Sequence, residues 1–341
     1  MSNKKFPKSR SRPATSRPVK PPPPPPPPPP PFEPRPKLRL APLLFGGTVL
    51  YIGAAYVMYY VTTEKNKASK MAENMNDAGG AKSAIDPSTF DTQTVWDRIA
   101  GSYDGDIGSE EYWTGIGLMR RRLLKHAKGD VLEVSAGTGR NFPYYVPDQI
   151  SSLTITDCNS TMLSEARSKF TQYAQKFHDT FVSFQTADAE HLDTITSPSS
   201  SPPNPSSAPS KYDTVIDTFG LCSCADPVAA LVSFSRACRS SSSRILLLEH
   251  GRSHWKWLNG IMDARAPRHV ERWGCWYNRD VMALLDREEV RKEVEVIYVR
   301  RWHFGTTCYV VARPRRTEWE EKGEKGRGGP DLVDMMKDVV Q

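Results

Sequence analysis

Five short apolar runs recur between residues 131 and 250, and they constrain the fold of this chain more than any other feature. Helix-like stretches such as 160–177 and 227–239 separate most of them. Apolar runs that alternate with amphipathic helices are typical of a parallel sheet with helices on both faces. The centre of the chain is therefore predicted to be an α/β domain. The predicted strands are VLEVS (131–135), LTITD (153–157), FVSFQ (181–185), YDTVIDTF (212–219) and RILLLEH (244–250).

Two more β-rich runs follow at residues 293–304 and 306–314, with Gly305 between them. Such a pair is typical of two antiparallel strands at the end of a sheet. With the five earlier runs they predict a mostly parallel seven-stranded sheet that ends in an antiparallel hairpin. His303, in the first of these two runs, is interpreted as a structural residue.

The net charge of +7 is concentrated in residues 1–39, which contain ten Lys or Arg and one acidic residue, Glu33. Of the 46 basic and 39 acidic residues in the whole chain, 36 and 38 lie outside this segment. The remainder is about neutral, so no nucleic-acid partner is predicted. The eleven prolines of 21–31 predict a polyproline II rod, with a stiff spacer favoured over a ligand for a proline-reading module.

Residues 41–61 carry no charge and are long enough for one helix to cross the hydrocarbon core of a bilayer. The sequence therefore predicts a single transmembrane helix at 40–62. A cleaved signal peptide is the main alternative, but the preceding segment is too long and too rich in proline for one. The excess of basic residues before the helix places the N-terminus on the cytosolic or matrix side and the folded domain across the membrane.

The remaining boundaries follow from composition. Residues 63–88 are interpreted as a linker and 89–316 as the folded domain, with a disordered Ser/Pro insertion at 197–210. Residues 317–341 are predicted to be a flexible tail. The first 20 residues are basic and lack acids, as in mitochondrial transit segments, although prolines interrupt any helix there.

Six cysteines occur without any C-x-x-C spacing. That pattern predicts neither a zinc site nor a disulfide framework. The cysteines are interpreted as ordinary buried thiols, and no metal site is predicted.

The turn after the first predicted strand is the expected ligand site, because ligands of open α/β sheets bind beyond the carboxyl ends of the strands. The turn reads Glu133-Val-Ser-Ala-Gly-Thr-Gly139-Arg-Asn-Phe142. A dinucleotide fingerprint requires a small residue where Phe142 stands, so a nicotinamide-dependent oxidoreductase is disfavoured. A P-loop requires Gly-Lys followed by Ser or Thr, which is absent. The turn instead suits a nucleoside that carries a cation.

These residues resemble the first motif of the class I S-adenosylmethionine-dependent methyltransferases, acidic-x-Gly-x-Gly-x-Gly. Glu133, Gly137 and Gly139 match it, and Ser135 occupies the first glycine position. The resemblance covers residues 94–314 and implies a Rossmann-like fold with S-adenosylmethionine as cofactor. The wording LEVSAGTGRN, LLLEHGR and HFGTTCYVVARP, with the basic, anchored N-terminus, is similar to the membrane-anchored mitochondrial methyltransferases of fungi, the Oms group.

The resemblance implies a set of cofactor-binding residues. Asp157 would accept hydrogen bonds from the ribose hydroxyls, and Asp188 would lie against the adenine amino group. Glu133 would organise the turn and the methionine end of the cofactor. Each aspartate has a plain alternative, because an Asp at a strand end often only caps a helix or forms a turn. The full set is Glu133, Ser135, Ala136, Gly137, Gly139, Asp157, Asp188, Ala189 and Tyr103, the last placed over the cofactor.

Catalysis of methyl transfer rests mainly on aligning donor and acceptor. A base is needed only when the acceptor must lose a proton, and Glu249 and His250, at the end of the fifth strand, are the candidates. A structural role for His250 is the alternative. A core or capping role is favoured over contact with the substrate for three aromatic residues, Trp273, Trp276 and Tyr277.

The sequence thus predicts an enzyme anchored by one helix in the mitochondrial inner membrane, with its domain on the intermembrane-space side. It would transfer a methyl group to an unidentified small-molecule, lipid-like or protein acceptor. The alternative is a catalytically silent methyltransferase-like assembly factor in the same membrane.

Overall fold

The computed structural model describes residues 86–193, 195 and 211–315. The predicted segments 1–39 and 40–62, the insertion at 197–210 and the tail at 317–341 lie outside the described residues, as does all but the last part of the linker. Within the described ranges, no helix has both the length and the apolar character needed to cross a membrane.

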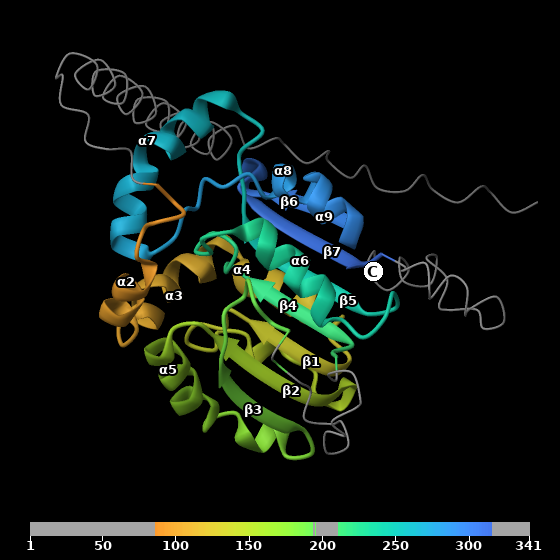
Figure 1. Cartoon of the computed structure of the whole chain (residues 1–341). Coiled ribbons are helices and arrows are strands. Elements are labelled where there is room, and N and C mark those ends of the chain that lie inside the picture. The colour runs from red at the N-terminus through yellow and green to blue at the C-terminus, as the bar shows by residue number, and fades with distance from the viewer. Residues whose placement is uncertain (1–85, 194, 196–210, 316–341) are drawn as a thin grey trace, which may run out of the picture. The chain divides into compact units, whose positions relative to one another are not determined.

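Seven strands form one sheet in the order β3-β2-β1-β4-β5-β7-β6 (Figure 1). The first five are parallel to one another, and β7 runs antiparallel to both β5 and β6. This confirms the predicted sheet and its antiparallel end. The strands are β1 (Gly129–Val134), β2 (Ile150–Asp157), β3 (Phe181–Thr186), β4 (Thr214–Thr218), β5 (Arg244–His250), β6 (Val294–Trp302) and β7 (Thr307–Pro314).

Helices precede, connect and cover these strands. Asp91, Asn159, Asp226 and Asp280 each cap a helix by accepting hydrogen bonds from backbone N–H groups of its first turn. The helices are α2 (Thr92–Ile99), α3 (Tyr103–Thr114), α4 (Ile116–Leu124), α5 (Ser160–Phe170), α6 (Pro227–Ala237), α7 (Lys256–Trp273), α8 (Val281–Leu285) and α9 (Glu288–Glu293). Short 3-10 helices are η1 (Phe142–Tyr144), η2 (Pro147–Gln149), η3 (Ala174–Phe177) and η4 (His303–Gly305).

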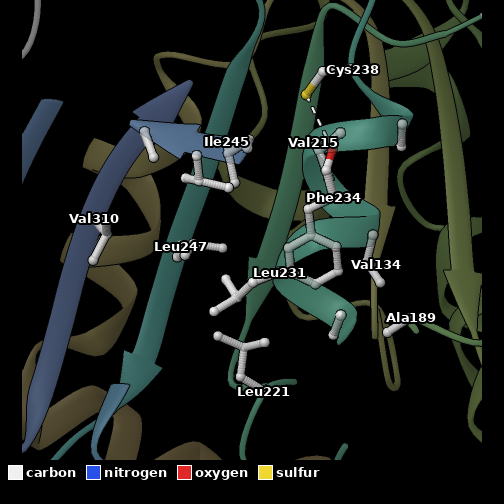
Figure 2. Close-up of a cluster of buried hydrophobic side chains, with 14 of the residues drawn as sticks. Val134, Ala189, Val215, Leu221, Leu231, Phe234, Cys238, Ile245, Leu247 and Val310 are labelled. Carbon is white, nitrogen blue, oxygen red and sulfur yellow. Dashed lines mark hydrogen bonds between the residues drawn. The ribbon is translucent and has the colours of Figure 1, made fainter. Parts of the chain in front are cut away.

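Side chains alternate between two cores, one on each face of the sheet. In β5, Ile245 and Leu247 lie in one core, and Leu246 and Leu248 lie in the other. Figure 2 shows the first core, where Leu231 and Phe234 lie on a helix packed over the sheet. Because successive residues of a strand point to opposite faces, a strand covered on both sides is apolar at every position. This explains the unbroken apolar run ILLL at 245–248 in β5.

The segment after β1 turns back through η1 and η2 instead of starting a long helix. Phe142 begins η1 and is completely buried, with its ring against Phe170 at 5.3 Å and Phe184 at 6.4 Å between centroids. Gly139 has φ of 77°, and a Cβ built there would overlap the Phe142 ring. The aromatic ring therefore fills the space below the turn that a dinucleotide fold leaves to a small residue.

We predict that Gly139→Ala destabilises the protein more than Gly137→Ala. Both glycines have positive φ, at 77° and 55°, so each alanine adds a backbone strain of about 1 kcal/mol. A Cβ at Gly137 meets no atom within 4 Å, whereas a Cβ at Gly139 meets buried Phe142 and adds an overpacking cost of about 1–3 kcal/mol. Chemical denaturation of both variants measures the difference, and equal losses would show that the ring moves aside freely.

Candidate functional site

A cavity of about 300 Å³ lies at the carboxyl ends of the parallel strands. The strand order turns around between β1 and β4, because β2 and β3 lie on one side of β1 and β5 lies beyond β4. Loops diverge at such a switch point and leave a crevice, which is where open α/β sheets bind ligands. Among the residues that line the cavity are Gln93, Trp96, Tyr103, Arg120, Ser135, Ala136, Gly137, Asp157, Asp188, Ala189, Thr218, Phe219 and Gly220.

The turn after β1 supplies backbone to this cavity. Ser135 has φ of 49° and Gly137 has φ of 55°, so both lie in the left-handed region. Glycine adopts that region without strain. This explains why the acidic-x-Gly-x-Gly-x-Gly motif, which the turn resembles, has glycine at the position of Ser135. The N–H of Ala136 donates to the Thr156 carbonyl at 2.9 Å and fixes the turn on β2.

Asp157 ends β2 and connects the turn to the next helix. Its Oδ2 accepts from the Gly137 N–H at 2.7 Å, and its Oδ1 accepts from the Asn159 N–H at 2.8 Å. Burial raises the pKa of Asp157 to about 6, against the lowering effect of the two N–H donors. The carboxylate lines the cavity and has acceptor capacity left on both oxygens.

Asp188 and Ala189 follow β3 and also line the cavity. The Asp188 side chain is 54% exposed and pairs with His191 at 3.1 Å. Its Oδ1 accepts from the Glu190 N–H at 3.0 Å, as in an Asx turn. The residue therefore forms a turn and faces the cavity at the same time.

Tyr103 begins α3 and lines the cavity next to Trp96 of α2. The two rings meet edge to face with 5.6 Å between centroids, and Trp273 and Tyr103 form a second edge-to-face pair at 6.3 Å. Trp276 packs in a small core with Phe90. The three aromatic residues for which a core or capping role was expected, Trp273, Trp276 and Tyr277, are outside the cavity lining.

Arg120 is a site residue that sequence analysis missed. It lies on α4, is almost fully buried and lines the cavity. Its Nη1 donates to Asn141 at 2.9 Å and to Thr218 at 2.8 Å, and its Nη2 donates to Glu111 at 2.9 Å. Its Nε–H has no hydrogen-bond partner among the residues that the structure describes. One feature of the sequence could have identified Arg120 as a buried residue. It is the one cation on the apolar face of this helix, which is formed by Ile116, Met119, Leu123 and Leu124.

Ion pairs join α3 to the turn beside Arg120. Arg140 pairs with Glu111 at 2.7 Å and with Asp104 at 3.0 Å, and Lys169 also pairs with Asp104. Burial by itself raises the pKa of Glu111, but Arg120 and Arg140 outweigh it and hold that pKa below its usual value. Three cations and two anions leave this network with one net positive charge at the cavity wall.

Glu133 and Gly139 do not line the cavity. Glu133 is buried under the turn, where its carboxylate accepts from the Tyr145 hydroxyl at 2.6 Å and from Asn141 at 2.9 Å. Burial raises the pKa of Glu133 to about 7. The structure thus places Glu133 where it supports the turn from below, through Asn141, which also contacts Arg120.

The two candidate bases lie behind the cavity wall. Glu249 is completely buried, and its carboxyl oxygens have no hydrogen-bond partner in the described part of the chain. Burial, and then the neighbouring Asp217, raise the pKa of Glu249 well above its usual value. The His250 ring lies tilted against that of the cavity-lining residue Phe219, with 4.7 Å between ring centroids. His303 bridges Thr307 at 2.8 Å and the Thr114 carbonyl at 3.0 Å, which fits a structural residue.

No protein-family model matches the chain. The chain is similar to the mitochondrial methyltransferase OMS1 of Saccharomyces cerevisiae, with 38% identity over 237 residues. The match covers 69% of this chain and 49% of the yeast protein, so the chain spans about half the length of that relative.

Two solved structures align with the described fold. The N-methyltransferase NodS of Bradyrhizobium japonicum WM9, in complex with S-adenosyl-l-homocysteine, has 14% identity and a TM-score of 0.44, and the alignment covers 67% of this chain and 100% of NodS. The YcgJ protein of Bacillus has 14% identity and a TM-score of 0.40, with 59% and 97% covered. By sequence the chain is similar to the yeast mitochondrial methyltransferase, and its glycine turn resembles the first motif of the class I S-adenosylmethionine-dependent methyltransferases.

Proposed function

We propose that the domain binds S-adenosylmethionine in the cavity between β1 and β4 and transfers its methyl group to an acceptor. The observation that carries this proposal is the convergence of the turn backbone, Asp157 and Arg120 on one cavity. The yeast relative is named a methyltransferase, which supports the same activity here.

The charges along the cavity fit the two halves of this cofactor. Its amino-acid half ends in a carboxylate, and Arg120 lines the cavity as part of a network of net positive charge. Its ribose has two hydroxyl donors, and Asp157 is a buried acceptor. Because Arg120 lines the cavity and is positively charged, a carboxylate bound beside it would gain a charge-assisted interaction.

The residues of this chain would act by holding and shielding the reactants. When bound, S-adenosylmethionine supplies a methyl group on a sulfonium, whose leaving group is already activated. Asp157 would orient the ribose, and Tyr103 and Phe219 would exclude water from the wall of the cavity. Glu249 and His250 are separated from the cavity by its lining, so we assign no proton-transfer step to them.

The acceptor is proposed to be a small molecule, a lipid-like molecule or a protein near a membrane. The yeast relative is named as mitochondrial, and the uncharged stretch at 41–61 has the composition of a single membrane anchor. We propose the mitochondrial inner membrane as the site of action, with the domain on the intermembrane-space side. Comparing methylated lipids, quinones and peptides in cells with and without the protein identifies the acceptor.

We predict that Asp157→Asn weakens S-adenosylmethionine binding about tenfold to a hundredfold, because hydrogen bonds to a charged group contribute about 1.5–3 kcal/mol. Asparagine has the same shape but only one acceptor oxygen, so one of the N–H groups of Gly137 and Asn159 loses its acceptor, and circular dichroism of the variant checks that it stays folded. Isothermal titration of purified wild type and variant measures the change. Asp179→Asn, an exposed acid paired only with His178 among the described residues, is the matched control and should bind as wild type does.

Absence of binding to the folded wild type at millimolar cofactor would end the cofactor proposal. The same substitution separates the enzyme from the silent assembly factor. If cells that carry Asp157→Asn keep the cellular role although binding is lost, the protein acts as a scaffold.

We predict that cofactor affinity falls about tenfold between pH 7.5 and pH 5. The pKa of Asp157 is raised to about 6 by burial, so the carboxylate that accepts the ribose hydroxyls is mostly protonated at pH 5. Titrations at pH 7.5, 6 and 5 measure the slope, and Asp157→Asn should remove it. A slope that persists in the variant would assign the proton to another group, such as Glu133, whose pKa is about 7.

We predict that Arg120→Gln weakens the binding of S-adenosylhomocysteine about tenfold or more. The binding of 5′-methylthioadenosine should change little. The second ligand has the same nucleoside but no amino-acid carboxylate. The substitution also removes the ion pair between Arg120 and Glu111 and could disturb the fold. Such a disturbance would weaken both ligands alike, so the ratio of the two affinities isolates the effect on the carboxylate. Arg120→Lys keeps the charge and should restore part of the discrimination, whereas equal losses for both ligands would contradict a carboxylate at Arg120.

A further inference from the structure

Three metal-ligating side chains from distant parts of the chain meet behind the cavity wall. Cys222 lies in the loop after β4, His250 ends β5, and Cys275 follows α7. One donor atom from each lies within 4.8 Å of the other two. The backbone holds the loops together, because the Trp276 N–H donates to the Cys222 carbonyl at 2.9 Å.

Two of the three donor pairs lie closer together than a tetrahedral ion would hold them. The Sγ atom of Cys275 is 2.9 Å from Sγ of Cys222 and 3.2 Å from Nδ1 of His250. Around a zinc ion, with Zn–S of about 2.3 Å and Zn–N of about 2.0 Å, two sulfurs would be about 3.8 Å apart and S···N about 3.5 Å. The ligands would have to spread by less than about 1 Å.

Charge and burial favour a divalent ion over a monovalent one. Cys222 and Cys275 are only 2% and 5% exposed. Two thiolates with Zn²⁺ and a neutral imidazole form a site of zero net charge, whereas Cu⁺ would leave one buried negative charge, which is costly. Two cysteines and one histidine are also a known zinc ligand set that leaves the fourth position open.

Two simpler arrangements of the same groups exist. As thiols, Cys222 can donate to the Phe219 carbonyl at 3.3 Å and Cys275 can contact Cys222. A disulfide between the two cysteines would require an approach of about 0.9 Å, given an S–S bond of about 2.05 Å. The thiol arrangement also accounts for the contact of 3.2 Å between Cys275 Sγ and His250 Nδ1 as a hydrogen bond, so the metal content of the purified chain separates it from a metal site.

We propose that Cys222, Cys275 and His250 bind one zinc ion. The ion would join the loops after β4 and α7 to the end of β5, directly behind Phe219, and would thereby fix one wall of the cavity. The fourth coordination position is left for water or another non-protein ligand. This inference concerns the folded chain alone and holds whether or not the cavity binds S-adenosylmethionine.

The test is the zinc content of the purified full-length chain, measured by mass spectrometry of the metal after dialysis. Wild type should hold about one zinc per chain, and Cys222→Ser and Cys275→Ser should hold at least about tenfold less. Cys238→Ser is the matched control, because Cys238 is also buried and donates to a backbone carbonyl, that of Phe234, at 3.3 Å (Figure 2). It should retain the zinc content of wild type.

A second measurement does not depend on the folding of any variant. Chelator-treated wild type, shown to be folded by circular dichroism, is titrated with Zn²⁺ alone and then with Co²⁺, whose thiolate charge-transfer absorption reports sulfur ligands. Saturable binding of one ion with that absorption supports the site. No uptake of either ion, wild-type zinc content in both cysteine variants, copper in place of zinc, or a Cys222–Cys275 disulfide in zinc-free protein would each overturn the proposal.

Discussion

The hydrogen bond from the Gly137 N–H to Asp157 connects the two strand ends on which the cavity depends. A turn with positive φ at Ser135 and Gly137 exposes N–H groups that the sheet cannot satisfy. The carboxylate accepts one of them and, with its other oxygen, starts the segment that leads into α5. Because Asp157 is buried, the acid is held there at the cost of a raised pKa. The same carboxylate is thus a structural brace and the best-placed acceptor for a ligand.

A second layer of polar contacts sets the position of the N-terminal helices. Arg120 contacts Glu111 of α3, Asn141 of the turn and Thr218 of β4, so one guanidinium touches three separate segments. Buried ion pairs contribute little to net stability, because desolvation offsets the attraction, but breaking one leaves an uncompensated charge. Their effect here is geometric, since α3 carries Tyr103 and is held against the glycine turn. The cavity therefore has a fixed wall although it lies on loops and short helices.

The fold could be predicted from the sequence to the extent that it depends on local periodicity. The runs 131–135 and 244–250 became β1 and β5 within two residues, because strands covered on both faces are apolar at every position. The turn was found because glycine and acidic residues at strand ends have local causes. Arg120 was missed because its partners lie 9 to 98 residues away. The meeting of Cys222 with Cys275, 53 residues apart, was equally invisible, since the absence of C-x-x-C spacing says nothing about contacts formed by tertiary folding.

The strand order has a consequence for how the domain assembles during synthesis. The strand β6 pairs only with β7 among the described strands, and β7 is the last of them in the chain although it lies between β5 and β6. When β6 leaves the ribosome it has no partner to join, and its hydrogen-bonding edge stays open until the residues of β7 emerge. The parallel strands can pair early. The edge of β5 gains its partner only when β7, the last described strand, has been synthesised.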